Sequence, residues 1–239
     1  MTETEEPSEA GADREFLKYT FYRVQAEWRR LPDETKKKHR SEFVQLLHEF
    51  EEEVTLRCYS LHGIRADADF MTWAFDPRLE TFVEMARRVS STELGHYLDT
   101  MYAYLAATKR SSYLGGHAHA GQDGLGRKPM PRGSRYLFVY PFVKKREWYS
   151  IPFERRQEIM REHFRVGHKY PSVQIHTGYS FGLDDQEFVL AFESDEPLDF
   201  LDLVMELRSS EASRYTERET PIFTCILSTP EHMLDALGR

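Results

Sequence analysis

The chain contains an internal repeat, and this repeat restricts its fold more than any other feature. Residues 18–30 and residues 135–149 both begin with an alternating, aromatic-rich run, which is typical of a half-buried strand. Each run then reaches a tryptophan, Trp28 in the first copy and Trp148 in the second. Two segments with the same pattern, 120 residues apart, indicate two copies of one structural unit.

A proline follows four residues after each tryptophan, at Pro32 and Pro152. Proline is tolerated at the first position of a helix, because the N–H that it lacks has no partner there. A charged amphipathic segment follows each proline. We therefore expect a helix at about 33–52 in the first copy and at about 153–166 in the second.

The similarity continues beyond these helices. Residues 67–75 (DADFMTWAF) parallel residues 184–192 (DDQEFVLAF), and a further helix is predicted after each, at about 77–89 and 197–209. The order of elements is therefore β-α-β-β-α-β, twice over. Antiparallel strands with helices on one face form a ferredoxin-like unit. We predict an α+β fold in which two ferredoxin-like repeats form a dimeric α+β barrel, the alternative being chance similarity between amphipathic segments.

The repeat also divides the chain. We expect an N-terminal ferredoxin-like domain at 14–108 and a C-terminal one at 135–239, joined by a basic, Gly- and Pro-rich loop at 109–134. A loop of this length is usually functional or disordered. Residues 1–13 are acidic and are predicted to be a disordered tail.

Composition excludes several classes of protein. The net charge is −8 and the pI is about 5.7, which argues against a general nucleic-acid binder. Cys58 and Cys225 are too few and too far apart for a disulfide scaffold or a zinc ribbon. No apolar run approaches the ~18 residues of a membrane span, and no signal peptide is visible. A cytoplasmic protein is the expectation.

The two copies differ at one helix position. When Trp28 is aligned with Trp148, His163 falls opposite Phe43. His163 shares its helix face with apolar residues three or four positions away. Two interpretations are open: a buried structural histidine, or a haem iron ligand on an apolar helix face. A site with several protein ligands to a metal is less consistent with the sequence, since no Cys/His cluster lies nearby.

Charge and aromatic content also differ between the copies. Nine basic residues and one acidic residue lie between Lys109 and Arg146. This excess favours a ligand with several carboxylates or phosphates, although a solvated basic surface is the alternative. Alternation places Tyr136, Phe138 and Tyr140 on one strand face. Such residues usually pack in a core, but a tyrosine or tryptophan beside an oxidised iron centre can also carry a radical.

Four phrases occur in order in the second half: YPFVKKREWY (140–149), EHFRVGHKYP (162–171), TGYSFGLDDQEF (177–188) and DFLDLVMELRSSEASRYT (199–216). Together they resemble the chlorite dismutase superfamily. Within it they are most similar to the coproheme decarboxylases, which form haem b in the last step of a bacterial haem pathway. The resemblance is strong over about 135–227 and rests on architecture in the first half.

The resemblance implies a dimeric α+β barrel, assembled as a homopentamer, with haem in the C-terminal half. It implies that His163 is the proximal iron ligand, that Tyr140 is the catalytic radical tyrosine and that Lys144 assists at a propionate. Gln174 would lie on the distal side. Trp148 would relay an oxidising hole, the alternative being a core tryptophan like Trp28. The remaining matches are Arg208 and Ser213 at propionate-contacting positions, Glu211 as the acid behind the proximal histidine, and Phe142 where some members have methionine.

The implied reaction is the oxidation of two propionates of Fe-coproporphyrin III to vinyl groups by hydrogen peroxide, with loss of CO₂. The coproheme is both substrate and redox cofactor, with no separate metal ion. A ferrochelatase is the delivery partner that the pathway implies. The sequence leaves open the order of the two decarboxylations, the physiological oxidant, and whether His117 or His119 of the connecting loop is a distal base.

Three rival functions remain at this point. A chlorite dismutase requires a distal arginine, but the segment SVQIHTGYSF offers Gln174 and no arginine. A non-catalytic haem-binding protein would need His163 but not Tyr140. A barrel that binds no haem would share only the fold, since fold alone does not fix function.

Overall fold

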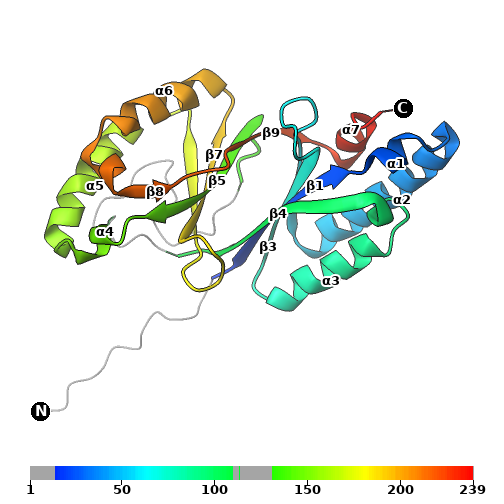
Figure 1. Ribbon diagram of the computed structural model, residues 1–239, viewed down its shortest axis with the longest axis horizontal. Coiled ribbons are helices and arrows are strands. Elements are labelled where there is room, and N and C mark those ends of the chain that lie inside the picture. Colours follow the sequence, from blue (N-terminus) through cyan, green and yellow to red (C-terminus); the bar gives the residue numbers. More distant parts are fainter. Residues whose placement is uncertain (1–13, 110–112, 114–130, 239) are drawn as a thin grey trace, which may run out of the picture.

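A computed structural model describes residues 14–109, 113 and 131–238 of this chain (Figure 1). The acidic tail at 1–13 and most of the connecting loop, including His117 and His119, lie outside the described residues. The predictions made for those segments stay predictions.

The first half follows the predicted order of strand, helix, strand, strand, helix, strand. The helices predicted at about 33–52 and 77–89 both form, close to the predicted ranges. Its elements are β1 (Phe16–Val24), α1 (Ala26–Arg29), α2 (Asp33–Glu53), β2 (Thr55–Ser60), β3 (Phe70–Asp76), α3 (Leu79–Ser90), the 3₁₀ helix η1 (Gly95–Tyr97) and β4 (Leu98–Ala107).

The second half repeats this order and adds a strand and a helix at the C-terminus. Its elements are β5 (Tyr136–Lys144), α4 (Glu147–Ser150), α5 (Phe153–Gly167), β6 (Gln174–Tyr179), β7 (Phe188–Ser194), α6 (Pro197–Arg208), the 3₁₀ helix η2 (Glu211–Tyr215), β8 (Thr216–Arg218), β9 (Phe223–Ser228) and α7 (Pro230–Asp235). Pro32 and Pro152 are the N-cap residues of α2 and α5, and each helix begins at the next residue, as the predicted ranges require.

One hydrogen bond recurs in both halves. The backbone N–H of Glu93, after α3, donates to Glu42 Oε2 of α2 at 2.9 Å. The backbone N–H of Glu211, after α6, donates to Glu162 Oε2 of α5 at 3.4 Å. Glu42 and Glu162 are 120 residues apart, as are the two tryptophans. The repeat therefore extends to the bond that fixes each 3₁₀ segment to its long helix.

The strands of the two halves form one antiparallel sheet, in the order β7-β6-β4-β1-β3-β2-β9-β5-β8. A further pairing between β5 and β7 joins the two sides of this sheet, so that eight of the described strands form a closed hydrogen-bonded ring. The helices lie outside the strands, with α4, α5 and α6 beside one half and α1, α2, α3 and α7 beside the other (Figure 1). The fold class is α+β, as predicted.

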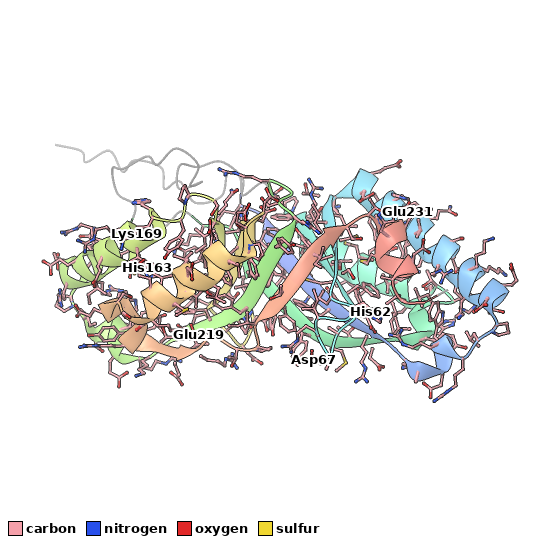
Figure 2. The ribbon with its side chains drawn as sticks, turned by 90° about the horizontal axis from the view of Figure 1, so that it is seen from above. His62, Asp67, His163, Lys169, Glu219 and Glu231 are labelled. Carbon is pink, nitrogen blue, oxygen red and sulfur yellow. The ribbon has the colours of Figure 1, made fainter. Side chains whose placement is uncertain are left out.

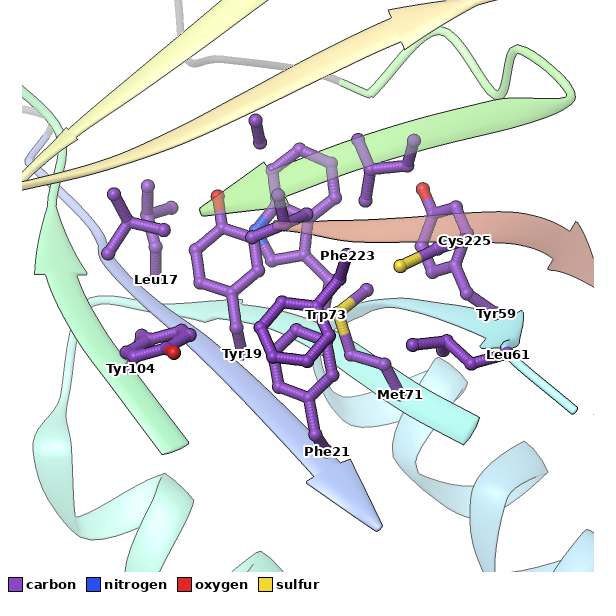
Figure 3. Close-up of a cluster of buried hydrophobic side chains, with 14 of the residues drawn as sticks. Leu17, Tyr19, Phe21, Tyr59, Leu61, Met71, Trp73, Tyr104, Phe223 and Cys225 are labelled. Atoms are coloured by element: carbon purple, nitrogen blue, oxygen red, sulfur yellow. The ribbon is translucent and has the colours of Figure 1, made fainter. Parts of the chain in front are cut away.

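A buried aromatic cluster fills the space enclosed by the strands (Figure 3). Leu17, Tyr19 and Phe21 contribute alternate positions of β1, and each is at most 1% exposed. Tyr19 stacks on Trp73 of β3, with ring centroids 5.2 Å apart. Phe223 of β9 lies 4.1 Å from Phe21, between ring centroids. The interior of the ring is therefore a packed core formed by strands of both halves.

The last helix completes the core of the first half. Met233 and Leu234 of α7 and the following Leu237 are buried in a cluster with Phe43 of α2. In contrast, α5 of the second half packs mainly against α6 and η2. The two long helices thus have different surroundings although they are copies of one element.

Replacement of Leu234 by alanine is expected to lower the free energy of unfolding by about 2–5 kcal/mol, because it opens a cavity at a fully buried position. Urea unfolding followed by circular dichroism measures this loss. The control is Leu198→Ala on α6, where the side chain is 71% exposed and the expected change is within about 0.5 kcal/mol. Equal effects of the two substitutions would contradict the packing described for α7.

Candidate active site

The candidate site begins on the outer face of β5. Leu137 and Val139 point into the ring and join the interior cluster. Phe138 and Tyr140 alternate with them and pack with residues of α5 and α6. Because side chains alternate along a strand, Phe142 lies on the same outer face as Tyr140. The aromatic face predicted for this strand is therefore directed toward the helices.

A pocket of about 430 Å³ lies between this strand face and α6. Tyr140 contributes a phenol to its wall, and Arg208 and Glu219 contribute charged groups. Arg208 and Glu219 form an ion pair with each other. The remaining lining is mainly apolar: Phe138, Pro197, Phe200, Leu201, Val204, Met205, Ile222 and Thr224.

Tyr140 is held firmly in this wall. Its side chain is 6% exposed, and its ring stacks on Phe192 of β7 with centroids 5.8 Å apart. Burial raises the pKa of the Tyr140 phenol, and the nearby Arg208 guanidinium partly opposes that rise. The phenol is therefore protonated at neutral pH and faces a pocket with a cation in its wall.

His163 lies on α5 in the same half of the molecule as Glu219 (Figure 2). Two neighbours of His163 on its helix face are buried: Ile159 in a cluster with Trp148, and Val166 in a cluster with Tyr140. The His163 side chain lies between these two clusters and is partly exposed. Burial and the positive charge of Lys144 lower the pKa of His163 to about 4. The imidazole is therefore neutral at pH 7, which is the form that binds iron. His163 is not part of the pocket wall around Tyr140.

Lys144 ends β5 and is the cation that influences His163. Burial lowers its pKa to about 8, although the Glu187 carboxylate acts in the opposite direction. Its Nζ lies 4.6 Å from the ring centroid of Trp148 and 5.2 Å from that of Phe142. It also donates to the Ala212 carbonyl at 3.3 Å. An ammonium held by aromatic faces and one carbonyl is well suited to bind an anionic group.

Glu187 is a residue of this site that was not predicted from the sequence. It is 8% exposed, and its Oε2 accepts hydrogen bonds from the Lys144 backbone N–H at 2.8 Å and from the Tyr149 hydroxyl at 2.6 Å. Glu187 directly precedes β7, and its side chain thus connects the start of that strand to the end of β5 and to the short helix α4. The sequence did contain a signal for Glu187, because it is an acidic residue directly before an apolar strand. A carboxylate at such a position is buried only when hydrogen-bond donors or cations lie beside it.

Two predicted residues lie on η2. The Ser213 hydroxyl donates to the backbone carbonyls of Arg208 and Ser210, at 2.7 and 3.0 Å. The Glu211 carboxylate accepts two hydrogen bonds from Arg155 of α5, at 2.7 and 2.8 Å. Glu211 therefore connects η2 to the first turn of α5. This contact joins η2 to the helix that carries His163, and the predicted role of Glu211 as the acid behind the proximal histidine stays a prediction.

Trp148 is buried, with 3% of its surface exposed, in a cluster with Ile159 and Ala212. Its ring centroid lies 5.4 Å from that of Tyr215, at the end of η2. Trp148 is thus close to Lys144 and to the helix of His163. Its counterpart Trp28 is fully buried in the core of the first half.

Gln174 is the predicted site residue that the structure places elsewhere. It pairs in register with Glu193, and Glu193 is fully buried. His176, two residues on, forms a hydrogen bond with Glu193 at 2.7 Å and contacts Trp73 of the interior cluster edge-on. Since side chains alternate, Gln174 points into the ring, whereas Tyr140 points out of it. Thr177, in register with Leu190 beside Tyr140, takes the outer face instead.

Among the described residues, no three His, Cys, Asp or Glu side chains are grouped so that they could hold a metal ion. Over the same residues, no helix combines the length and apolar character that crossing a membrane would require.

Comparison with known proteins identifies the class to which this fold and site belong. The family model described as chlorite dismutase matches residues 36–228, which is most of the chain. The chain belongs to the chlorite dismutase family. A curated relative from Mycolicibacterium smegmatis, named coproheme decarboxylase, is 35% identical over 170 residues, which cover 70% of each protein.

Solved structures share the fold. Chlorite dismutase from Candidatus Nitrospira defluvii, in complex with imidazole, superimposes with a TM-score of 0.83 at 23% identity, covering 92% of this chain and 94% of that one. A haem-binding protein from Thermus thermophilus superimposes with a TM-score of 0.81 at 23% identity, covering 91% and 92%. At this level of identity the likeness concerns the fold alone.

Proposed function

We propose that this chain is a coproheme decarboxylase, which converts two propionates of Fe-coproporphyrin III to vinyl groups with hydrogen peroxide and thereby forms haem b. The observation that carries the proposal is that four side chains suited to this reaction lie on one side of the second half. A buried phenol, Tyr140, and a guanidinium, Arg208, share one pocket. A neutral imidazole, His163, lies within the field of the Lys144 ammonium. The relative named coproheme decarboxylase supports the same function.

The residues of the site fit an iron macrocycle that carries carboxylates. An apolar, aromatic wall suits the ring of a porphyrin. His163 needs no deprotonation to bind iron, because its pKa is about 4. Lys144 offers one cation for a propionate, and Arg208, at the end of α6, offers a second if a propionate replaces its partner Glu219. The Ser213 hydroxyl, on η2, donates to the backbone carbonyl of Arg208. The looser packing of α5 against the sheet favours a ligand between His163 and the strands.

The iron macrocycle, once bound and activated by peroxide, supplies the oxidising power for the reaction. Tyr140, after it has lost an electron and a proton, takes a hydrogen atom from the β-carbon of a propionate next to it. Lys144 and Arg208 hold the propionate carboxylates and so decide which carbon faces the phenol. The carbon radical would then lose a further electron, to the second oxidising equivalent of the same peroxide, and CO₂, which leaves the vinyl group. Gln174 has no role in this proposal, because it lies inside the ring.

Mass spectrometry of the porphyrin after peroxide addition tests the function. The expected result is two successive losses of CO₂ with the accompanying hydrogens, ending at haem b. Oxygen release from chlorite, measured alongside, separates this activity from that of a chlorite dismutase. An unchanged porphyrin together with rapid, sustained oxygen release would reject the decarboxylase.

The affinity for coproheme is expected to fall as the pH rises through about 8, the pKa of Lys144. A carboxylate binds the ammonium form of Lys144, so binding takes up a proton once that group has become neutral. Above this pH the affinity should fall by up to about tenfold per pH unit. Absorbance titrations at a series of pH values measure it. Lys144→Arg, which stays charged, should give a flat profile over this range; an unchanged slope would exclude Lys144 from the binding site.

The resemblance also implies features of the assembly and of the cell. We propose a homopentamer in the cytoplasm that receives coproheme from a ferrochelatase. Sedimentation velocity of the purified protein tests the assembly.

A further inference from the structure

The shortest hydrogen bond from a tyrosine to a carboxylate among the described residues lies beside the candidate site. The Tyr149 hydroxyl donates to Glu187 Oε2 at 2.6 Å. The pair is part of the fold and not a surface contact, because Glu187 is 8% exposed and also accepts the backbone N–H of Lys144. Tyr149 packs against the buried cluster that contains Trp148, its neighbour in the chain.

This bond decides what happens to the phenol when it loses an electron. An oxidised phenol is a strong acid and must release its proton at once. A carboxylate within hydrogen-bond distance accepts that proton without any movement of the chain. Burial and the Glu187 carboxylate raise the pKa of Tyr149, so the phenol keeps its proton until it is oxidised. Tyr149 can therefore become a neutral radical in a single concerted step.

The neighbouring aromatic residues are less suited to hold an oxidising equivalent. The Lys144 ammonium lies 4.6 Å from the Trp148 ring centroid, and this positive charge opposes a positive hole on the indole. Tyr215, 5.4 Å from Trp148 between centroids, has no carboxylate partner among the described hydrogen bonds. Tyr113 also lies near Trp148, at 6.3 Å between ring centroids, but its hydroxyl accepts a hydrogen bond from the Arg156 guanidinium at 3.2 Å, and this positive charge opposes loss of an electron from the ring. The Tyr149 hydroxyl donates to a carboxylate, so we expect a hole that reaches Trp148 to move to Tyr149.

We propose that Tyr149 is a second redox-active tyrosine, which gives an electron to the peroxide-oxidised iron macrocycle by way of Trp148 and gives its proton to Glu187. The step reduces the macrocycle by one electron. It leaves a neutral phenoxyl radical on Tyr149 and a protonated carboxyl on Glu187. In the reverse step an electron returns to Tyr149 and the proton returns from Glu187.

This inference rests on the proposed function, since that function supplies the oxidised macrocycle. The inference adds a second residue, Tyr149, that can hold an oxidising equivalent while no propionate lies next to Tyr140. Two propionates are oxidised in turn, so the site passes through a state in which the second has yet to reach the phenol. A reversible store beside Trp148 would protect the protein during that interval.

Freeze-quench electron paramagnetic resonance of the coproheme-loaded Tyr140→Phe protein, mixed with peroxide, tests the proposal. This variant removes the first tyrosine and leaves Tyr149 in place. The expected signal is a tyrosyl radical, which narrows when the protein contains ring-deuterated tyrosine. The added substitution Tyr149→Phe should lower the signal by about tenfold or more, since the phenol that releases the proton is gone. Glu187→Gln, which keeps a hydrogen-bond acceptor but no carboxylate, should lower it as well.

Two control substitutions keep the test specific. Tyr215→Phe alters the same cluster without touching a carboxylate. Tyr102→Phe removes a phenol that donates to Asp67 at 2.7 Å in the first half of the molecule. Both should leave the signal intact, and the Soret band of each complex verifies that the macrocycle is bound. A signal that survives Tyr149→Phe, or that Tyr215→Phe removes equally, would overturn the inference.

The two proposals fail in different ways. If the bound porphyrin loses no CO₂ but the radical depends on Tyr149, the decarboxylase proposal fails and the inference stands. If CO₂ is lost and the radical does not depend on Tyr149, the inference alone fails. A chain that binds no iron porphyrin would overturn both.

Discussion

Replacement of Tyr140 by phenylalanine is expected to leave coproheme affinity within about twofold and to slow vinyl formation by roughly 10²-fold or more. Only the hydroxyl is removed. The ring that stacks on Phe192 at 5.8 Å between centroids remains, so the pocket wall keeps its shape. A residue that acts only in the chemical step should lower the rate and not the affinity.

The measurement combines a Soret titration for affinity with chromatography of the porphyrins at timed intervals after peroxide addition. Tyr136→Phe is the matched control, because Tyr136 lies on the same face of β5 and contacts Arg135 at 5.3 Å from the ring centroid. That variant should form product at the wild-type rate. Normal product formation by Tyr140→Phe would refute the role of the phenol, whatever the affinity.

The repeat was sufficient to predict the order of the elements, because hydrophobic periodicity and the proline before each long helix are local signals. It also led to His163, since aligning Trp28 with Trp148 puts a histidine where the first copy has the fully buried Phe43. The structure gives the physical reason for this difference. Leu234 and its neighbours in α7 pack with Phe43, whereas α5 packs mainly against α6 and η2 and leaves His163 partly exposed.

The strand registers could not be read from matching letters. The phrases 67–75 and 184–192 align Ala74 with Ala191. In the sheet, however, Ala191 pairs with Val139 as Trp73 pairs with Tyr19, and these positions are equivalent in the repeat. The two strands are thus offset by one residue from the sequence match. A slip of one residue exchanges the two faces of a strand.

The place predicted for Gln174 and the absence of Glu187 from the predicted site have the same origin. A sequence motif does not give the face of the sheet that a residue occupies, and the function of each residue depends on that face. Gln174 points into the ring beside Glu193, and Glu187 lies beside Lys144. Ring closure depends on pairings between distant strands, such as that of Cys58 with Ser228, and no local pattern encodes them. The sequence could indicate the residue types of the site but not the surface on which they meet.

Replacement of His163 by alanine is expected to weaken coproheme binding by about 10- to 10³-fold. Loss of the imidazole removes the iron ligand but leaves the apolar wall and the cations of Lys144 and Arg208 in place. Binding should therefore become weaker without being abolished. A Soret titration measures the affinity, and the position of the band reports whether a nitrogen ligand is bound.

Rescue by imidazole shows whether His163 is an iron ligand or only a residue that packs between the helices and the strands. His163 is partly exposed between two buried clusters, so its removal opens a space that free imidazole can enter. Added imidazole should restore the wild-type Soret band of His163→Ala. The matched control is His168→Ala, at the exposed C-cap of the same helix, which should bind coproheme normally. If His163→Ala kept the wild-type spectrum and affinity, no iron would be bound at this helix, and the roles assigned to Tyr140 and Tyr149 would lose their oxidant.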